Sequence, residues 1–132
     1  VVIIAAASII CKDGKKYEKP HSIEEVIANL KELSNSVNQG ITGVTIVDKL
    51  SGKILTFSCV TDIKFKVIDD EDIKLYIEHE EYLLDKAGYS LEGTMSLFVD
   101  KIDGDYYNVL GLPLGMIYTK IKELGYELKD FN

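Results

Sequence analysis

Apolar residues fill almost all of the first eleven positions of the chain, Val1 to Cys11, and no charged residue interrupts them. A run of this kind is typical of a strand that is buried on both faces. The segment Lys12–Lys15, with a glycine at position 14, predicts a tight turn, and Lys15–Lys19 predicts the returning strand, which Pro20 ends. The first twenty residues therefore predict a β-hairpin.

Two later segments have the periodicity and the first-turn chemistry of helices. Ser22 and Glu25 have the spacing of a capping box, and the apolar stripe that follows predicts a helix to about Ser34. Asp69 precedes a second, acidic first turn, where negative charge opposes the positive end of a helix. An acidic cluster of this kind at 69–72 is also compatible with a metal site, but a helix start is the favoured interpretation.

Between these helices the residues alternate as in strands. Gln39–Asp48 predicts one strand, Lys49–Gly52 a turn, and Lys53–Val67 a long strand rich in β-branched residues, so that a second hairpin results. From Glu80 to Gly93 the periodicity fails. Long loops without structure of their own tend to carry function, so we expect the functional site near this loop.

The segment Ser96–Gly125 predicts a strand, a turn, a strand and a helix. Ser96–Ile102 alternates, Asp103 and Gly104 suit a two-residue hairpin turn, and Tyr106–Leu110 predicts the returning strand. Apolar residues three to four apart then predict a helix from Leu114 to the cap at Gly125. We expect this helix to pack on the hairpin. Together these elements predict one α/β domain over residues 1–132, with a mixed, hairpin-rich β-sheet flanked by helices.

Composition narrows the possible functions. The net charge is −7, and no run of Lys or Arg occurs, which argues against a general nucleic-acid or membrane-surface binder. Cys11 and Cys59 lie in apolar, strand-like sequence, as buried thiols do in a reducing, cytoplasmic protein. His21 and His79 are far from each other and from the cysteines, so zinc-ligand spacing is absent and surface positions are favoured over a catalytic base.

Four motifs in one order give the chain a family resemblance. They are Glu-Lys-Pro at 18–20, Ile-Thr-Gly-Val at 41–44, Asp-Lys-Ala-Gly at 85–88 and Asp-Gly-Asp-Tyr-Tyr-Asn-Val-Leu-Gly-Leu-Pro-Leu at 103–114. In these residues the chain resembles the Maf (septum-formation inhibitor) family. The resemblance implies an inosine-triphosphatase-like fold and a nucleoside triphosphate pyrophosphatase, which cuts non-standard or pyrimidine nucleotides between the α- and β-phosphates with a divalent metal, Mg²⁺ or Mn²⁺.

Two departures from the family pattern affect the expected chemistry. The family begins with a strand and a Ser-x-Ser-Pro-Arg-Arg loop that holds the triphosphate, and none precedes Val1, so we expect the first strand–helix unit to be missing. The family motif Gly-Ala-Asp-Thr-Val-Val aligns with residues 5–10, which places Ala7 where the resemblance implies the proton-accepting aspartate. A methyl group can neither accept a proton nor bind a metal. We therefore expect an impaired enzyme.

The resemblance also implies roles for five residues that are present. Lys19, Asp85 and Lys86 match substrate-binding positions, although Lys19 could be a solvated lysine at a strand end, and Asp85 and Lys86 could be a structural ion pair. Ser8 and Glu92 match positions linked to substrate choice. A carboxylate at 92 only accepts hydrogen bonds and suits guanine, whereas the segment Tyr106–Pro113 favours the pyrimidine branch. An exposed loop glutamate is the alternative for Glu92, so the nucleotide stays open.

Two functions follow as competing hypotheses. The first is a Maf-type pyrophosphatase acting on a nucleoside triphosphate, and the second is an inactive nucleotide-binding or dimerising module, since the resemblance also implies a homodimer. We expect the loop 80–93 to line the largest cleft, with Lys19 and Lys86 projecting into it. We also expect the strand from Val1 to lie inside the sheet, beside a position that is unfilled or covered by a partner chain.

Overall fold

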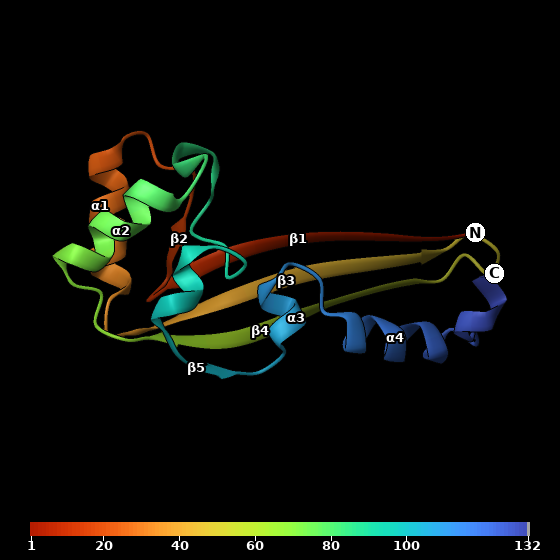
Figure 1. The fold of residues 1–132 in the computed structure, drawn as a ribbon. Coiled ribbons are helices and arrows are strands. Elements are labelled where there is room, and N and C mark those ends of the chain that lie inside the picture. Colours follow the sequence, from red (N-terminus) through yellow and green to blue (C-terminus); the bar gives the residue numbers. More distant parts are fainter. Residues whose placement is uncertain (132) are drawn as a thin grey trace.

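The computed structural model describes residues 1–131, and its elements follow the chain in the order shown in Figure 1. The strands are β1 (Val2–Lys12), β2 (Lys15–Tyr17), β3 (Val37–Asp48), β4 (Ile54–Phe65) and β5 (Val99–Asp103). The α-helices are α1 (Ile23–Leu33), α2 (Asp70–His79), α3 (Tyr106–Val109) and α4 (Leu114–Glu123). Short 3₁₀ helices occupy Leu83–Asp85, Thr94–Phe98 and Leu128–Phe131.

One five-stranded sheet with the order β2-β1-β3-β4-β5 forms the centre of the molecule. The predicted α/β class is confirmed. All four strand pairings are antiparallel, so the sheet is not mixed as we expected. β1–β2 and β3–β4 are antiparallel because each pair is a hairpin, in which the turn reverses the chain. β1, β3 and β4 are long, and Figure 1 shows them extending together away from α1 and α2, toward the end where both chain termini lie.

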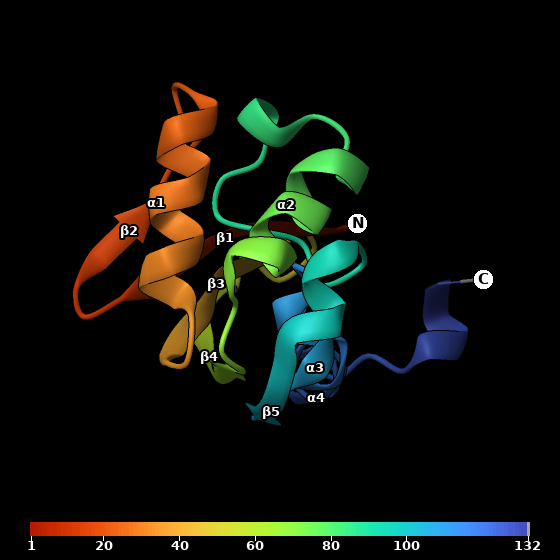
Figure 2. The ribbon, with the colours of Figure 1, turned by 60° about the vertical axis from the view of Figure 1, so that its left-hand side comes forward.

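All the α-helices pack on one face of this sheet. The buried residues of β3 alternate strictly from Asn38 to Asp48, so they share a single face. At one end this face meets α1 and α2 in a core that includes Leu30, Phe65 and Tyr76. At the other end Val44 and Ile46 meet Ile117 and Ile121 of α4. Figure 1 and Figure 2 show α1 and α2 side by side at one end and α4 along the other, near both chain termini.

The opposite sheet face is uncovered. Ile3 is 44% exposed, Ile54 is 64% exposed and Val60 is 54% exposed, and all three lie on this face. The prediction that the first strand is buried on both faces is therefore wrong. Its sequence is apolar throughout, but the described residues supply helices to only one side of it.

The outer edge of β1 is largely unoccupied. β2 pairs only with Ile10–Lys12, whereas β1 pairs with β3 along Val2–Cys11. Val2–Ile9 thus has one neighbouring strand within residues 1–131. The prediction that the chain's own residues leave a position beside this strand unfilled is confirmed for residues 1–131. That a partner chain covers this position stays a prediction.

The predicted helix and turn signals are mostly confirmed. Ser22 accepts a hydrogen bond from Glu25 N, and Asp69 forms a full capping box with Asp72, so the acidic cluster starts α2. Asn35 has a φ of 49°, as expected just after a helix end. Asp13 and Gly14 form the turn between β1 and β2. No helix in residues 1–131 is long and apolar enough to cross a bilayer.

The predicted strand at Tyr106–Leu110 is wrong, because these residues form α3 and the turn after it. Asp105 Oδ1 accepts hydrogen bonds from Tyr107 N at 2.8 Å and from Asn108 N at 3.2 Å, which starts a helix. β5 begins at Val99, later than predicted, because Thr94–Phe98 is a 3₁₀ helix. The helix from Leu114 is confirmed, and Gly125 follows it with a φ of 93°.

Candidate functional site

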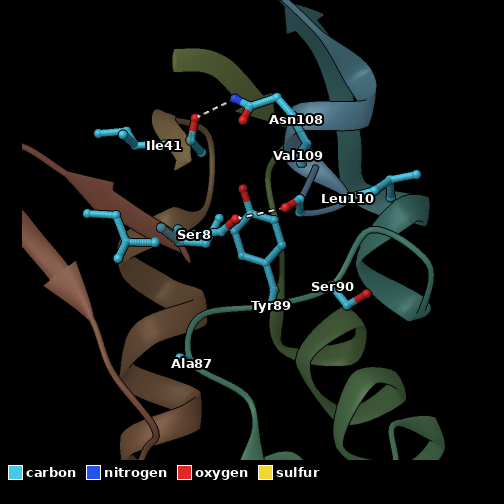
Figure 3. A pocket seen from close by; sticks show the side chains of 12 residues that line it. Ser8, Ile41, Ala87, Tyr89, Ser90, Asn108, Val109 and Leu110 are labelled. Carbon is cyan, nitrogen blue, oxygen red and sulfur yellow. Dashed lines mark hydrogen bonds between the residues drawn. The ribbon is translucent and has the colours of Figure 1, made fainter. Parts of the chain in front are cut away.

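A pocket of about 220 Å³ lies where the outer edge of β1 meets two loops. Residues 8–10 of β1 and residues 40–41 of β3 form its floor, and residues 87–90 and 108–111 form its walls. Figure 3 shows Ser8 and the ring of Tyr89 facing the middle of this pocket from different elements. Four segments that are far apart in the sequence therefore meet at one point of the sheet edge.

Ser8 brings the principal hydroxyl group of β1 to the pocket. Its Oγ lies 2.9 Å from Thr42 Oγ1 and donates to the carbonyl of Gly111 at 3.2 Å. Thr42 Oγ1 in turn lies 3.4 Å from the backbone carbonyl of Asn108. The two hydroxyl groups have two hydrogens for three contacts, so one of the three contacts is always without a hydrogen. This network can therefore exchange a hydrogen bond with a ligand without breaking the sheet.

Asn108 fastens the wall made by residues 108–111 to the sheet. Its side chain is buried, and its Nδ2 donates to Gly40 O at 3.0 Å, Cys59 O at 3.1 Å and Thr61 Oγ1 at 3.0 Å. The amide nitrogen, rather than the amide oxygen, is assigned to this side because Gly40 O and Cys59 O are both acceptors and need a donor. Asn108 Oδ1 has no hydrogen-bond partner within residues 1–131. The bonds connect α3 to both β3 and β4.

The opposite wall depends on Tyr89 and Gly88. Tyr89 OH donates to Asn38 Oδ1, and burial raises the pKa of this phenol well above its usual range. Its ring lies edge-on to Phe65, with centroids 5.0 Å apart. Gly88 has a φ of 83°, and a Cβ there would lie 2.9 Å from Ile10 Cβ. The wall therefore packs on β1 at contact distance.

A second and larger cavity of about 730 Å³ lies between β4 and α4. The residues that line it include Cys59, Asp105 and Lys120, and none comes from the loop 80–93. Burial raises the pKa of the Cys59 thiol, with a further contribution from Asp105, so the thiol stays protonated at neutral pH. The loop lines the smaller pocket, so the prediction that it lines the largest cleft is wrong.

The segments that form the pocket lie in a region that matches a known protein family. The sequence profile of the Maf-like protein family matches residues 1–124 of this chain. The chain belongs to the Maf family. The match spans both pocket walls and the β1 edge, so the whole pocket lies inside the Maf-like region.

Three related Maf sequences from different organisms have the same name. The "dTTP/UTP pyrophosphatase" of Carboxydothermus hydrogenoformans is 41% identical over 126 residues, which are 95% of this chain and 67% of the relative. The protein of the same name from Pyrococcus furiosus is 38% identical and covers 96% and 65%. That of Thermococcus gammatolerans is 41% identical and covers 96% and 66%. The chain thus spans about two thirds of the length of these Maf relatives.

The six positions implied by the Maf resemblance do not converge on the pocket. Among them Ser8 lines it. Lys19 and Lys86 do not line this pocket, so the prediction that both lysines project into it is wrong. Glu92 is exposed and also lies outside the lining residues, and its backbone N–H donates to Ser90 Oγ. Asp85 is exposed at the end of a 3₁₀ turn.

Ala7 lies on the other face of the sheet from Ser8. The two residues are adjacent in β1, and successive side chains of a strand point to opposite faces. Ala7 pairs with Gly43, which pairs with Ser58, so a row of small side chains crosses the uncovered face at this point. A carboxylate at position 7 would have room there, since a Cβ on Gly43 would meet nothing within 4 Å.

The described residues do not form a complete metal site. Within residues 1–131, no three side chains of His, Cys, Asp or Glu lie close enough together to hold a metal ion. Mg²⁺ is usually held by one or two carboxylates together with substrate phosphates. The donor set in this part of the chain therefore does not fit a metal ion that is held by protein side chains alone.

Sequence reasoning missed the residues that build the walls of the pocket. Asn108 was seen only as a member of a family motif, Tyr89 only as part of the loop 80–93, and Glu80 only as the start of that loop. Their partners lie between 6 and 68 residues away along the chain, so helix and strand periodicities do not indicate them. A buried asparagine in a short loop motif is the one available signal, because such a side chain needs several hydrogen bonds.

Proposed function

We propose that this chain is the base-recognising part of a nucleoside triphosphate pyrophosphatase that acts on dTTP and UTP. The pocket at Ser8 is the observation that carries the proposal, because the β1 edge and the walls 87–90 and 108–111 meet there. The names of the Maf relatives support the choice of nucleotide. Localisation in the cytoplasm and a homodimer remain expectations from the sequence.

The dimensions and chemistry of the pocket suit a pyrimidine base. Pockets for drug-sized ligands have volumes of roughly 300–1,000 Å³, so about 220 Å³ suits a single ring rather than a whole nucleotide. Ile10 and Tyr89 supply apolar surface, and Ser8 and Ser90 supply hydroxyl groups. Ser90 Oγ accepts from Glu92 N, which leaves its hydrogen to donate. The carbonyl groups of uracil and thymine accept such hydrogen bonds.

The proposal also includes the cations that would neutralise the negative charge of the phosphates. Lys19 is exposed after β2 and would contribute a point charge to the triphosphate. Mg²⁺ or Mn²⁺ would arrive bound to the phosphates, with Asp85 as an exposed carboxylate near the loop. Pyrophosphate release by this chain alone should be slow, because position 7 carries a methyl group where a general base is needed. A missing general base typically costs ~10²–10⁴-fold in rate.

Binding and turnover can be measured separately. We expect UTP and dTTP to bind more tightly than CTP and 7-methyl-GTP in calorimetric titrations with Mg²⁺ or Mn²⁺, and Ser8→Ala to weaken UTP binding. The control Ser51→Ala removes a hydroxyl in the turn between β3 and β4. Equal binding of all four nucleotides, or none, would contradict the proposed base recognition.

The second candidate is an inactive nucleotide-binding or dimerising module, and Ala7 is the observation that favours it. Pyrophosphate release from UTP, dTTP, CTP and 7-methyl-GTP distinguishes the two. Turnover by the unchanged chain at the rate of a full-length relative would rule out impairment. A gain of activity in Ala7→Asp would show that only the base was missing, and tight binding without turnover in both proteins would favour the module.

A further inference from the structure

A single buried carboxylate connects three parts of the loop that forms one wall of the pocket. Glu80 lies directly after α2, and its side chain is 7% exposed. Its Oε2 forms an ion pair with the Lys86 ammonium group, and its Oε1 accepts a hydrogen bond from Thr94 N. The beginning, the middle and the end of the segment 80–94 are thus held by the same group.

The ion pair is largely removed from solvent, so its two members depend on each other. Burial alone would raise the pKa of Glu80, but the hydrogen bonds from Lys86 and Thr94 outweigh it and hold the pKa below its ordinary value. Glu80 is therefore ionised at neutral pH. A buried carboxylate of this kind needs a cation beside it, and the Lys86 side chain, 29% exposed, supplies that cation. The positive charge of Lys86 is thereby already neutralised.

The loop leaves no space around the Glu80 carboxylate. Gly93 has a φ of −106°, which any residue can adopt, yet a Cβ there would lie 2.1 Å from Glu80 Oε1. A side chain at position 93 would therefore displace the Glu80 carboxylate from its present position. On the other side of Lys86, Ala87, Tyr89 and Ser90 line the pocket and Gly88 contacts Ile10.

We infer that Glu80 is a positioning residue and that Lys86 is its anchor in the loop, not a phosphate ligand. Together they hold residues 87–90 against β1, where the pocket forms. The inference rests on the proposed function in taking this pocket as the site for the base. It reassigns the lysine that the family resemblance connects with the substrate.

Uridine and UTP distinguish an anchor from a phosphate ligand, because they differ only in the triphosphate. The test measures binding of each by the unchanged chain, Glu80→Gln and Lys86→Met, with Lys74→Met on the exposed side of α2 as a charge-matched control. We expect both loop variants to weaken uridine and UTP by the same factor, about three- to tenfold for loss of one ion pair. The ratio of the two dissociation constants should stay unchanged, and Lys74→Met should alter neither.

The opposite pattern would overturn the inference. A phosphate ligand predicts that Lys86→Met weakens UTP while uridine binding stays the same, and that Glu80→Gln, by releasing the lysine, strengthens UTP binding. Gly93→Ala provides a second variant that disturbs the carboxylate without removing a charge. It should weaken uridine binding as Glu80→Gln does, and full uridine binding by Gly93→Ala would contradict the anchor.

A stability measurement keeps the inference separate from the proposed function. If the unchanged chain binds neither uridine nor UTP, the proposed base recognition fails, but the anchor can still be tested by urea unfolding. Glu80→Gln, Lys86→Met and the double variant should then be non-additive by about fivefold or more in the unfolding equilibrium constant. Additive effects would overturn the anchor irrespective of nucleotide binding.

Discussion

Gly88 shows how one residue determines the distance between a loop and a strand. It combines a left-handed φ of 83° with contact to Ile10, whereas Gly14 has a similar φ of 80° and open space around its Cα. Gly88→Ala should therefore cost about 1–3 kcal/mol more than Gly14→Ala, since overpacking adds to the same backbone strain. Urea unfolding of both variants measures the difference.

Equal losses of unfolding free energy in the two glycine variants would mean that the loop moves away from β1 without a further loss of stability. In that case packing on β1 does not fix this wall of the pocket. The pair is well matched because both glycines lie outside helices and strands.

At the level of single residues the sequence identified candidates but not their partners. Ser8 was predicted to matter, and it does line the pocket. Lys86 was weighed as a phosphate ligand or as part of a structural ion pair, and it pairs with Glu80 rather than with the adjacent Asp85. Neither residue's partner could be predicted, because both partnerships depend on how distant segments pack.

Among the elements, α3 depends most on tertiary contacts. It has only four residues, too few to be stable alone, and Asn108 connects it to β3 and β4. Asn108→Ala should destabilise the protein by about 1–3 kcal/mol, because it leaves buried carbonyl groups without donors. Thermal unfolding of Asn108→Ala measures this loss of stability, with the exposed Asn35→Ala as a control. Asn35 has a positive φ of 49°, so the control itself loses a small amount of stability.

If Asn108→Ala loses no more stability than the control, water replaces the amide donors of Asn108. Hydrogen–deuterium exchange distinguishes this case, since α3 would then keep its native protection in the variant. Native protection together with unchanged stability would contradict the role given to Asn108.

The elements that the sequence predicted well are those with local signals. α1 and α2 have side-chain caps and clear apolar stripes, and the turn at Asp13–Gly14 has its own dihedral preference. The strand at Tyr106–Leu110 was predicted because Asp103 and Gly104 suit a hairpin turn, whereas its helical state follows from the Asp105 cap and from the distant partners of Asn108. A five-residue pattern cannot distinguish these outcomes, because β and α periodicities differ little over such a length.

On the scale of the whole molecule, three carboxylates stabilise the fold at neutral pH. Hydrogen bonds from Ser51 to Asp48 and from Lys15 to Glu32 hold the pKa of each carboxyl below its ordinary value, and the pKa of Glu80 is also lowered. Because the folded state binds protons less readily than the unfolded state, this stability is present above the ordinary carboxyl range, near about 4, and is lost as pH falls through it.

Urea unfolding at several pH values between 7 and 3 should therefore show a midpoint that falls with acidification. Asp48→Asn retains the side-chain size near Ser51 and Tyr126 but cannot titrate, so its midpoint should change less. A midpoint that is constant or rises toward pH 3, in the unchanged protein, would contradict the pKa directions.

Which faces of the sheet are covered could not be predicted from the sequence. Residues 1–11 are apolar on both sides of the strand, and this pattern is equally consistent with one or two covering layers. The structure supplies helices to one face, and the row Ala7–Gly43–Ser58 lies on the other. Coverage is a property of all the elements together, so no single stretch of the chain determines it.

The long outer edge of β1 has a consequence for solvent exchange. Lys12 and Lys15 flank a two-residue turn and pair through both backbone hydrogen bonds, so by alternation the amides of Val2, Ile4, Ala6 and Ser8 point outward. The amides between them point toward β3. Amide exchange followed by NMR should thus alternate along one strand, fast at the even positions and slow at the odd ones, and the alternation should end at Ile10, where β2 begins to pair.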